Sequence, residues 1–227
     1  MRVTWTTIPA LMLLLCTPGL SYVVDDDWEL YSKDDADPMV YTKTIEGQSI
    51  KAIKAVTVMD TSMKTMLTVL TDLSLVPEWI PVIGEARLIR KTNADGVSIN
   101  YMLTKFPWPI RNRDAVVETV IEYDEGSKTV TMESFGISGY VDELDGVIRT
   151  PTTFTRWTMF PLEDGKLHVE IITHSDPMGR IPKWLVNIIF TRTPGSMFSK
   201  LQETVDAETN RNRPFDEIHV FGKEVSL

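Results

Sequence analysis

The feature that most constrains this chain is a series of short extended segments with no room for helices between them. Runs rich in β-branched residues, many with alternating apolar and polar side chains, predict strands at residues 84–92, 96–106, 113–123, 128–137, 152–162 and 166–175. Turn-forming residues at 93–96, 124–126 and 163–165 separate several of these runs. A parallel connection needs a crossover of about a dozen residues, so most neighbouring strands must form antiparallel hairpins.

The remaining periodic segments complete an α+β chain. Residues 37–58 predict two more extended runs, and a short helix capped by Asp60 or Thr61 follows and ends near residue 72. From Pro182 onward the apolar spacing is that of a long amphipathic helix, which Pro194 must kink or break near its middle. The expected architecture is a curved antiparallel sheet whose apolar face is covered by this helix.

Composition narrows the possible functions. The 227 residues include 23 basic and 32 acidic ones, which give a net charge of −9. Such a surface repels phosphate backbones, and no cluster of basic residues offsets it, so we expect no nucleic-acid partner. A single cysteine and 43% hydrophobic residues exclude a disulfide scaffold and a disordered chain. We expect one domain with a sizeable core, and a monomer.

The N-terminus is typical of an export signal. Arg2 precedes an apolar stretch at 8–16, which is far shorter than the roughly 20 residues that span a bilayer. Gly19 and Ser21 occupy the small-residue positions of a cleavage site that would release a chain beginning at Tyr22. The alternative is a buried N-terminal strand or helix.

The chain is therefore expected to have three parts. Residues 1–21 form the signal peptide, residues 22–210 the folded domain, and residues 211–227 a C-terminal tail of undecided role. A chain released in this way would be periplasmic or secreted.

Three motifs occur in order along the folded part. They are FPWPIRNRD at 106–114, GVIR at 146–149 and DPMGRIPKWLVN at 176–187. With Trp28 and Trp79, they make the chain resemble the START family of lipid-transfer domains, and its phosphatidylcholine-transfer branch in particular. The resemblance covers nearly all of the folded part and suggests an exported bacterial member. It implies a helix-grip (START/Bet v 1-like) fold, in which a bent antiparallel sheet wraps the C-terminal helix around a tunnel for one hydrophobic lipid.

Strand alternation indicates which side chains face inward. In residues 113–123 the period of two puts two glutamates on the solvent face and Val117 and Thr119 on the other, and Met132 is inward by the same rule. Each of these residues could equally fill a solid core, and it is the resemblance that favours a cavity. The expected ligand-binding residues are Asn100, Val117, Thr119, Met132, Trp157, Trp184 and Ile188.

Two of these positions bear on the choice of lipid. The resemblance places Asn100 and Thr119 where sterol-type members carry a buried acidic residue and an arginine, and Val76 where the phosphatidylcholine branch uses an arginine. A neutral amide and a hydroxyl can orient a lipid hydroxyl or carbonyl, but they cannot offset a buried phosphate charge. The expected partner is a sterol, another neutral lipid of hopanoid-like or diacylglycerol-like type, or, less favoured, a phospholipid.

Residues 136–146 match the segment that acts as a gate in the family. Three glycines give this segment backbone freedom, and Ile137, Tyr140, Val141 and Leu144 give it an apolar tip. We expect this loop and the C-terminal helix to form a lid, and the loop to make transient contact with a membrane during lipid exchange. The alternative is a long surface loop that packs on the sheet.

The sequence offers little support for catalysis. His168, Glu170 and His174 share one face of a strand, but the two histidines lie about 20 Å apart and cannot share a metal ion. No motif of a nucleophilic or phosphate-binding site is present, so we expect no catalytic residue, metal or cofactor. The alternatives to a lipid carrier are a polyketide cyclase or aromatase-like enzyme that uses the same cavity, and a lipid sensor.

Overall fold

A computed structural model describes residues 27–32, 38–48, 50–92, 97–211, 219–220 and 223–224. The expected signal peptide at 1–21 and most of the tail at 211–227 lie outside these residues.

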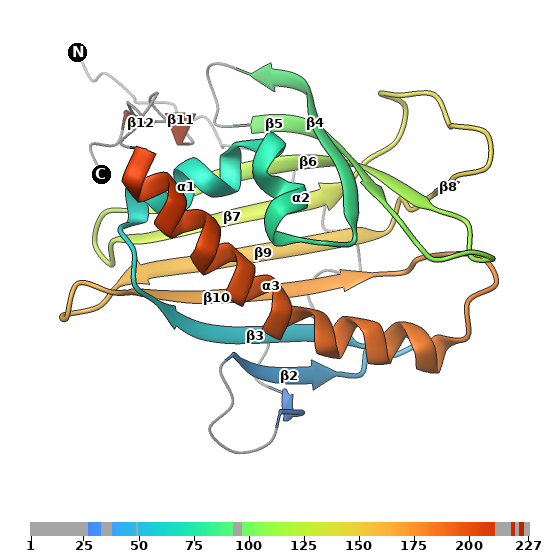
Figure 1. Ribbon diagram of the computed structural model, residues 1–227, viewed down its shortest axis with the longest axis horizontal. Coiled ribbons are helices and arrows are strands. Elements are labelled where there is room, and N and C mark those ends of the chain that lie inside the picture. The colour runs from blue at the N-terminus through green and yellow to red at the C-terminus, as the bar shows by residue number, and fades with distance from the viewer. Residues whose placement is uncertain are drawn as a thin grey trace, which may run out of the picture.

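The described strands form one large sheet in which almost every pair is antiparallel (Figure 1). Its strands are β1 (Glu29–Leu30), β2 (Met39–Lys43), β3 (Ala52–Met59), β4 (Ile83–Thr92), β5 (Val97–Thr104), β6 (Arg113–Asp124), β7 (Thr129–Gly136), β8 (Ile148–Arg149), β9 (Thr153–Pro161) and β10 (Leu167–Ser175). The order across the sheet is β1-β2-β3-β10-β9-β7-β6-β5-β4, and the short β8 pairs with β6 in parallel. Strands β11 (His219–Val220) and β12 (Lys223–Glu224) pair separately.

Three α-helices and one short 3₁₀ helix complete the described structure. Between β3 and β4 the chain forms α1 (Met63–Thr71), η1 (Leu73–Leu75) and α2 (Val76–Trp79), and it continues after β10 into α3 (Lys183–Arg211). Figure 1 shows α1, α2 and α3 on the same face of the sheet. The cap of α1 is Ser62, whose hydroxyl accepts from the Thr65 amide, and not Asp60 or Thr61 as expected.

Helix α3 is continuous, although Pro194 lies inside it. It bends around its middle (Figure 1), as expected where a proline removes one backbone hydrogen bond. The hydroxyls of Thr191 and Thr193 each donate to backbone carbonyls one turn earlier, which satisfies acceptors close to the bend. The sequence analysis expected Pro194 to kink or break the helix, and the structure has the kink without a break.

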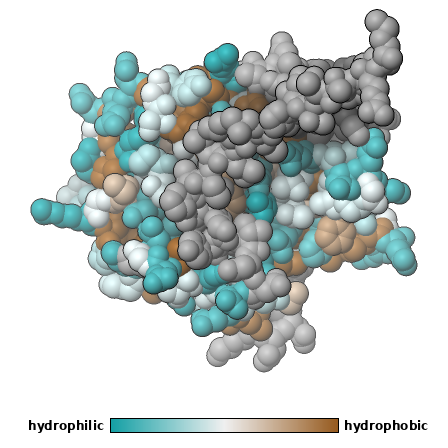
Figure 2. All heavy atoms as spheres, turned by 180° about the vertical axis from the view of Figure 1, so that it is seen from behind, coloured by the Kyte–Doolittle hydropathy of each residue, from teal (hydrophilic) through white to brown (hydrophobic). Residues whose placement is uncertain are grey.

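The main core lies between the inner face of the sheet and the helices. At its centre the Trp157 ring of β9 makes edge contacts with Trp79 and Phe198, at centroid distances of 6.0 and 6.1 Å. Smaller apolar clusters lie on the outer face of the sheet, and their members are buried. Figure 2 shows the molecule from behind, with hydrophobic residues scattered among hydrophilic ones. The α+β prediction is confirmed, and the six expected strands from residue 84 to 175 all form within two residues of their expected ends.

Candidate functional site

A cavity of about 990 Å³ lies between the inner face of the sheet and the helices. Strands β3 to β7, β9 and β10 supply its floor, and the segment from α1 to α2 and the middle of α3 supply its roof. Most of its lining is apolar, and its size is at the upper end for a pocket that encloses a small organic ligand.

Five of the seven expected binding residues line this cavity. They are Asn100, Val117, Thr119, Met132 and Trp157, and all five are buried. The alternation predicted for β6 is the reason, because Val117, Thr119 and Ile121 face the cavity while Val116 lies in a cluster on the opposite face. Asn100 follows the same rule on β5.

The other two expected residues, Trp184 and Ile188, do not line the cavity. Their side chains are 66% and 38% exposed. The first turns of α3 extend past the end of the cavity, where Val186 packs with Ile50 and Ile181. The helix turns that do line it contribute Ile189, Phe190, Thr193, Pro194 and Met197.

The expected lid at 136–146 lies elsewhere as well. Ile137 and Val141 pack on a cluster of Ile99, Tyr101 and Val116 on the outer face of the sheet, and Tyr140 and Leu144 are exposed. None of the four lines the cavity. In this structure residues 136–146 therefore form a long loop packed on the sheet, which is the alternative named above. The reason is that Ile137 and Val141 find apolar partners on the outer face.

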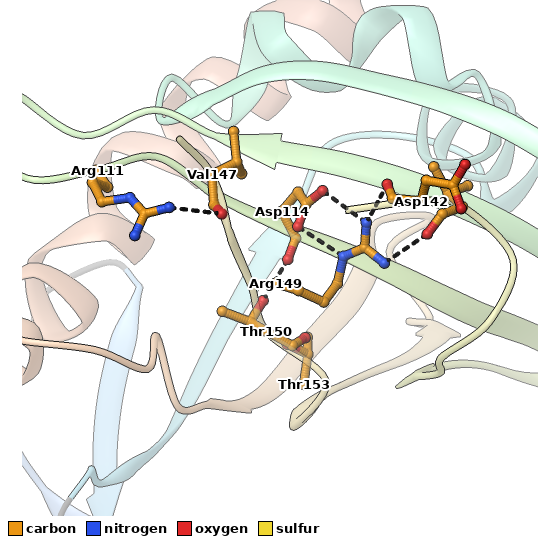
Figure 3. Close-up of polar contacts among 8 residues, drawn as sticks. Arg111, Asp114, Asp142, Val147, Arg149, Thr150 and Thr153 are labelled. Carbon is orange, nitrogen blue, oxygen red and sulfur yellow. Dashed lines mark hydrogen bonds and ion pairs between the residues drawn. The ribbon is translucent and has the colours of Figure 1, made fainter. Parts of the chain in front are cut away.

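A buried ion pair holds this loop in place (Figure 3). Arg149 donates to both carboxylate oxygens of Asp114, at 2.8 and 3.0 Å, and also to the carbonyls of Val141 and Asp142. The hydrogen bonds that Arg149 donates to Asp114 are the main cause of the raised pKa of Arg149. Arg111 adds hydrogen bonds to the carbonyls of Gly146 and Val147. These arginines therefore fasten the loop to β6.

A different segment, residues 105–112, borders the opening of the cavity. Lys105 and Pro107 are exposed lining residues, and the Lys105 amide donates to the Val82 carbonyl at 2.8 Å. Phe106 and Ile110 pack against the apolar cluster at the start of α3. The opening is thus framed by this segment, by the exposed lining residues around β4 and by α3. Sequence reasoning missed the segment, although its aromatic and proline residues belong to the first START-like motif.

Arg113 ties the same segment to the chain that precedes α3. Its guanidinium donates to the carbonyls of Pro177, at 2.9 Å, and Met178, at 3.0 Å, and lies 5.0 Å from the centre of the Phe106 ring. Burial is the main cause of its lowered pKa. Because carbonyls and a ring already surround this cation, it serves to join two segments of the chain.

Charged side chains are confined to the edges of the cavity. Asp72 accepts from the amide and hydroxyl of Ser74, and Arg87 pairs with Glu85 on the exposed face of β4. The remaining charged lining residues are Lys105 and Arg113. The centre of the floor is lined by neutral groups, including the hydroxyl residues Ser98, Ser134, Thr155 and Thr173, none of which was among the expected binding residues. The sequence carried a signal for three of them, because Ser98, Ser134 and Thr155 each lie two residues from an expected binding residue of the same strand.

The histidines of β10 are outside the cavity. His168 stacks on Phe160 at 4.3 Å, and His174 Nε2 lies 3.3 Å from the Ile50 carbonyl. Burial is the main cause of a lowered pKa in both. Over the residues that the structure describes, no group of three acidic, histidine or cysteine side chains is placed to hold a metal ion. The helices of that same part of the chain include none long and apolar enough to cross a membrane.

A bent antiparallel sheet that encloses a long helix and an apolar cavity defines a helix-grip protein. The START domain model matches residues 20–211, and the chain belongs to the START domain family. It is 27% identical over 181 residues to an uncharacterised protein of Pseudomonas aeruginosa, which covers 80% of this chain and 88% of that one.

Solved structures agree with this assignment. A STAR-related lipid transfer protein from Xanthomonas axonopodis is 25% identical, with a TM-score of 0.71, over 80% of this chain and 99% of that chain. Human StAR-related lipid transfer protein 5 shares the fold at 16% identity and a TM-score of 0.71, over 83% of this chain and 91% of that one. The helix-grip prediction is confirmed.

Proposed function

We propose that the protein is a non-catalytic carrier that encloses one hydrophobic lipid and moves it between membranes. The observation that carries this proposal is the mainly apolar cavity of about 990 Å³ between the sheet and α3. START domains are associated with hydrophobic ligands, and the similar Xanthomonas protein is named a lipid transfer protein. A cavity of this size favours a ligand because empty apolar space loses packing energy.

A neutral lipid fits this lining better than a phospholipid. A buried phosphate needs a cation inside the cavity, and Arg113 is already surrounded by carbonyls. Val76 is a buried apolar residue at the position where the resemblance places an arginine in the phosphatidylcholine branch. Membership of that branch stays a prediction, and we favour a sterol, hopanoid-like or diacylglycerol-like lipid.

The composition of the cavity favours a carrier over a cyclase-like enzyme. Among the described lining residues there is no histidine, cysteine, glutamate or tyrosine. The carboxylate of Asp72 is occupied by Ser74, and Lys105 is exposed at the opening. General acid–base catalysis needs such a group within hydrogen-bond reach of the substrate.

The exposed apolar residues near the opening suit contact with a membrane. Trp108 is 93% exposed beside lining residue Pro107, and Val82 and Leu88 are exposed lining residues. Trp184 and Ile188 are exposed on the nearby turns of α3. Tryptophan is favoured at the membrane–water interface, so segment 105–112 and the start of α3 would form both the gate and the docking surface.

Export completes the proposal. The short apolar stretch and the small residues at 19 and 21 would direct cleavage and place the protein in the periplasm or outside the cell. The mass of the exported chain tests the cleavage after Ser21, and the mass of the native particle tests the expected monomer.

Native mass spectrometry of the exported protein, followed by extraction and identification of the released molecule, tests the carrier directly. We expect one neutral lipid per chain. A chain that is purified empty and takes up neither sterols, diacylglycerols nor phospholipids would overturn the carrier, and a bound phosphatidylcholine would overturn the neutral-lipid preference.

Replacing Trp108 tests the docking surface. Trp108→Ala removes a large exposed apolar side chain that makes little contact with the fold, so we expect several-fold slower transfer of labelled lipid between neutral vesicles and an unchanged melting temperature. Tyr31→Ala is the matched control, an exposed aromatic residue beside β1 at the far edge of the sheet. Equal transfer rates for Trp108→Ala and the control would exclude this surface.

A further inference from the structure

The floor of the cavity carries a row of hydroxyl groups that crosses five adjacent strands. Ser98 of β5 lies opposite Thr119 of β6, which in turn lies opposite Ser134 of β7. Ser134 lies opposite Thr155 of β9, and Thr155 opposite Thr173 of β10. All five side chains line the cavity, and we call them the hydroxyl row. With strands about 4.8 Å apart, the row is about 19 Å long.

The rows on either side differ in polarity. On one side Ile121, Met132, Trp157 and Ile171 lie opposite one another and line the cavity. On the other side the lining includes the polar residues Asn100, Thr153 and Ser175, with the apolar Val117 opposite Asn100. A lipid that lies along the strands therefore meets hydrocarbon at one end of the floor and hydrogen-bonding groups at the other.

The Asn100 amide is hydrogen-bonded to the hydroxyl row. Its Nδ2 donates to Ser98 Oγ at 3.0 Å and to Thr119 Oγ1 at 3.1 Å, and Thr119 Oγ1 lies 2.8 Å from Ser134 Oγ. Because Thr119 accepts from the amide, its own proton is available to Ser134. The opposite amide orientation would leave two N–H groups without acceptors instead of one carbonyl oxygen without a donor.

The Asn100 Oδ1 atom is left without a hydrogen-bond partner in the protein. The residue is 4% exposed and its side chain lines the cavity. A buried carbonyl oxygen is stabilised by any ligand group that donates to it, and it gives no such gain to a group that only accepts. The cavity thus distinguishes a hydroxyl from an ether or an ester at this point.

We propose that the cavity selects a neutral lipid alcohol, whose free hydroxyl donates to Asn100 Oδ1 beside the hydroxyl row while its hydrocarbon lies on the apolar row of Ile121, Met132, Trp157 and Ile171. The inference rests on the proposed carrier function and adds the chemical group that is recognised. The apolar roof from Trp79 and Met197 covers the side of the ligand that faces away from the sheet.

Matched lipid pairs test this selection on the unaltered protein. The delipidated full chain is offered equal mixtures of cholesterol and its 3-methyl ether, and of dioleoylglycerol and its acetate, and the bound species are counted by native mass spectrometry. We expect the free alcohol of at least one pair to be loaded about tenfold more than its blocked partner, the effect of one buried hydrogen bond.

Two variants locate the recognition. Asn100→Leu removes the acceptor at similar size, and we expect the preference for the alcohol to fall to about twofold or less. Ser134→Ala is a smaller change that weakens the hydroxyl row and should reduce the preference several-fold. Thr131→Ala, which removes a hydroxyl from the side of β7 that faces away from the cavity, is the control and should leave the preference unchanged.

The outcomes separate the inference from the carrier proposal. Equal loading of alcohol and blocked lipid by the unaltered protein overturns the inference and leaves the carrier intact. An unchanged preference in folded Asn100→Leu or Ser134→Ala protein also overturns it. Failure to load any of the four lipids by a protein that does bind another lipid overturns the inference alone, and failure to load any lipid at all overturns the carrier proposal itself.

Discussion

Thr119 shows how one side chain determines the character of the cavity. Its side chain is only 6% exposed and lines the cavity. The Thr119 hydroxyl accepts a hydrogen bond from the Asn100 amide and shares another with the Ser134 hydroxyl. The three groups together are neutral and lie in an interior where an unpaired charge is strongly unfavourable. The polarity of this part of the floor therefore comes from dipoles alone, which suits a ligand without formal charge.

A charge at this position should disrupt both folding and loading. Thr119→Arg places a guanidinium in the cavity with no partner, so we expect a loss of at least about 3 kcal/mol in the free energy of unfolding and little bound lipid. Glu122→Arg, on an exposed residue of the same strand, is the control. Denaturant titration and native mass spectrometry measure the two effects, and normal loading by a stable Thr119→Arg protein would place the residue outside the ligand site.

His174 makes stability depend on pH. Burial lowers its pKa below the ordinary value of 6.5, so the unfolded chain binds a proton more readily than the folded one. The contribution of the neutral histidine to stability is present above pH 6.5 and is lost as the pH falls towards the folded pKa. His168 acts in the same direction.

The free energy of unfolding should therefore decrease between pH 7.5 and pH 5.5, where most carboxylates remain ionised. His174→Gln should flatten this decrease, whatever its effect at pH 7.5, and His168→Gln should flatten it further. A pH dependence that is identical in the variants and the unaltered protein would show that these histidines do not cause it.

Among the structural elements, the loop at 136–146, which was expected to be the lid, lies away from the cavity, whereas the segment at 105–112, to which the sequence analysis gave no role, borders its opening. The first is fastened to β6 by Arg149 and Arg111 and packs on the outer face. The second borders the cavity opening and packs against the start of α3. A gate must be able to move, and the segment without a buried ion pair is the better candidate.

Breaking the ion pair should loosen the loop without opening the cavity. Arg149→Met leaves the Asp114 carboxylate buried and unpaired, for which we expect a loss of about 3–5 kcal/mol in stability and faster amide exchange at 136–147. Lipid exchange with vesicles should keep its rate.

Arg156→Met is the matched control, because its partner Glu133 is partly exposed and the loss should be at most about 1 kcal/mol. A several-fold faster lipid exchange in Arg149→Met, at a temperature where the protein stays folded, would restore the loop to the role of lid.

At the scale of the whole molecule, ligand and fold depend on each other. The cavity lies between the sheet and the middle of α3, so these two elements do not pack directly on each other there. A bound lipid would supply the packing that the protein alone lacks. A ligand that binds only the folded state stabilises it in proportion to the logarithm of its concentration.

Delipidation should lower the melting temperature. A lipid at a hundredfold excess over its Kd contributes about 2.7 kcal/mol, which for a domain of this size is roughly 5–10 °C. Differential scanning calorimetry of loaded and delipidated protein measures the shift. A delipidated protein that melts at the same temperature and regains no stability with added lipid would indicate a cavity that does not hold a ligand.

The sequence alone determined the strands and, for β6 and β7, which face of the strand is turned inward. These features depend on local geometry: a period of two decides on which side Val117, Thr119 and Met132 lie, and the short turns impose antiparallel pairing. The proline bend of α3 is local in the same sense, because Pro194 lacks one donor wherever the helix is placed.

Only the tertiary structure decided which stripe of α3 faces the cavity and where each loop lies. Trp184 and Ile188 belong to one apolar stripe and Ile189 and Phe190 to the next, so the rotation of the helix depends on its contacts with Ile50 and the loop at 105–112. Likewise the position of residues 136–146 follows from Arg149 reaching Asp114, 35 residues away along the chain. Contacts between distant segments leave no periodic signal, which is why the walls of the cavity were predictable and its opening was not.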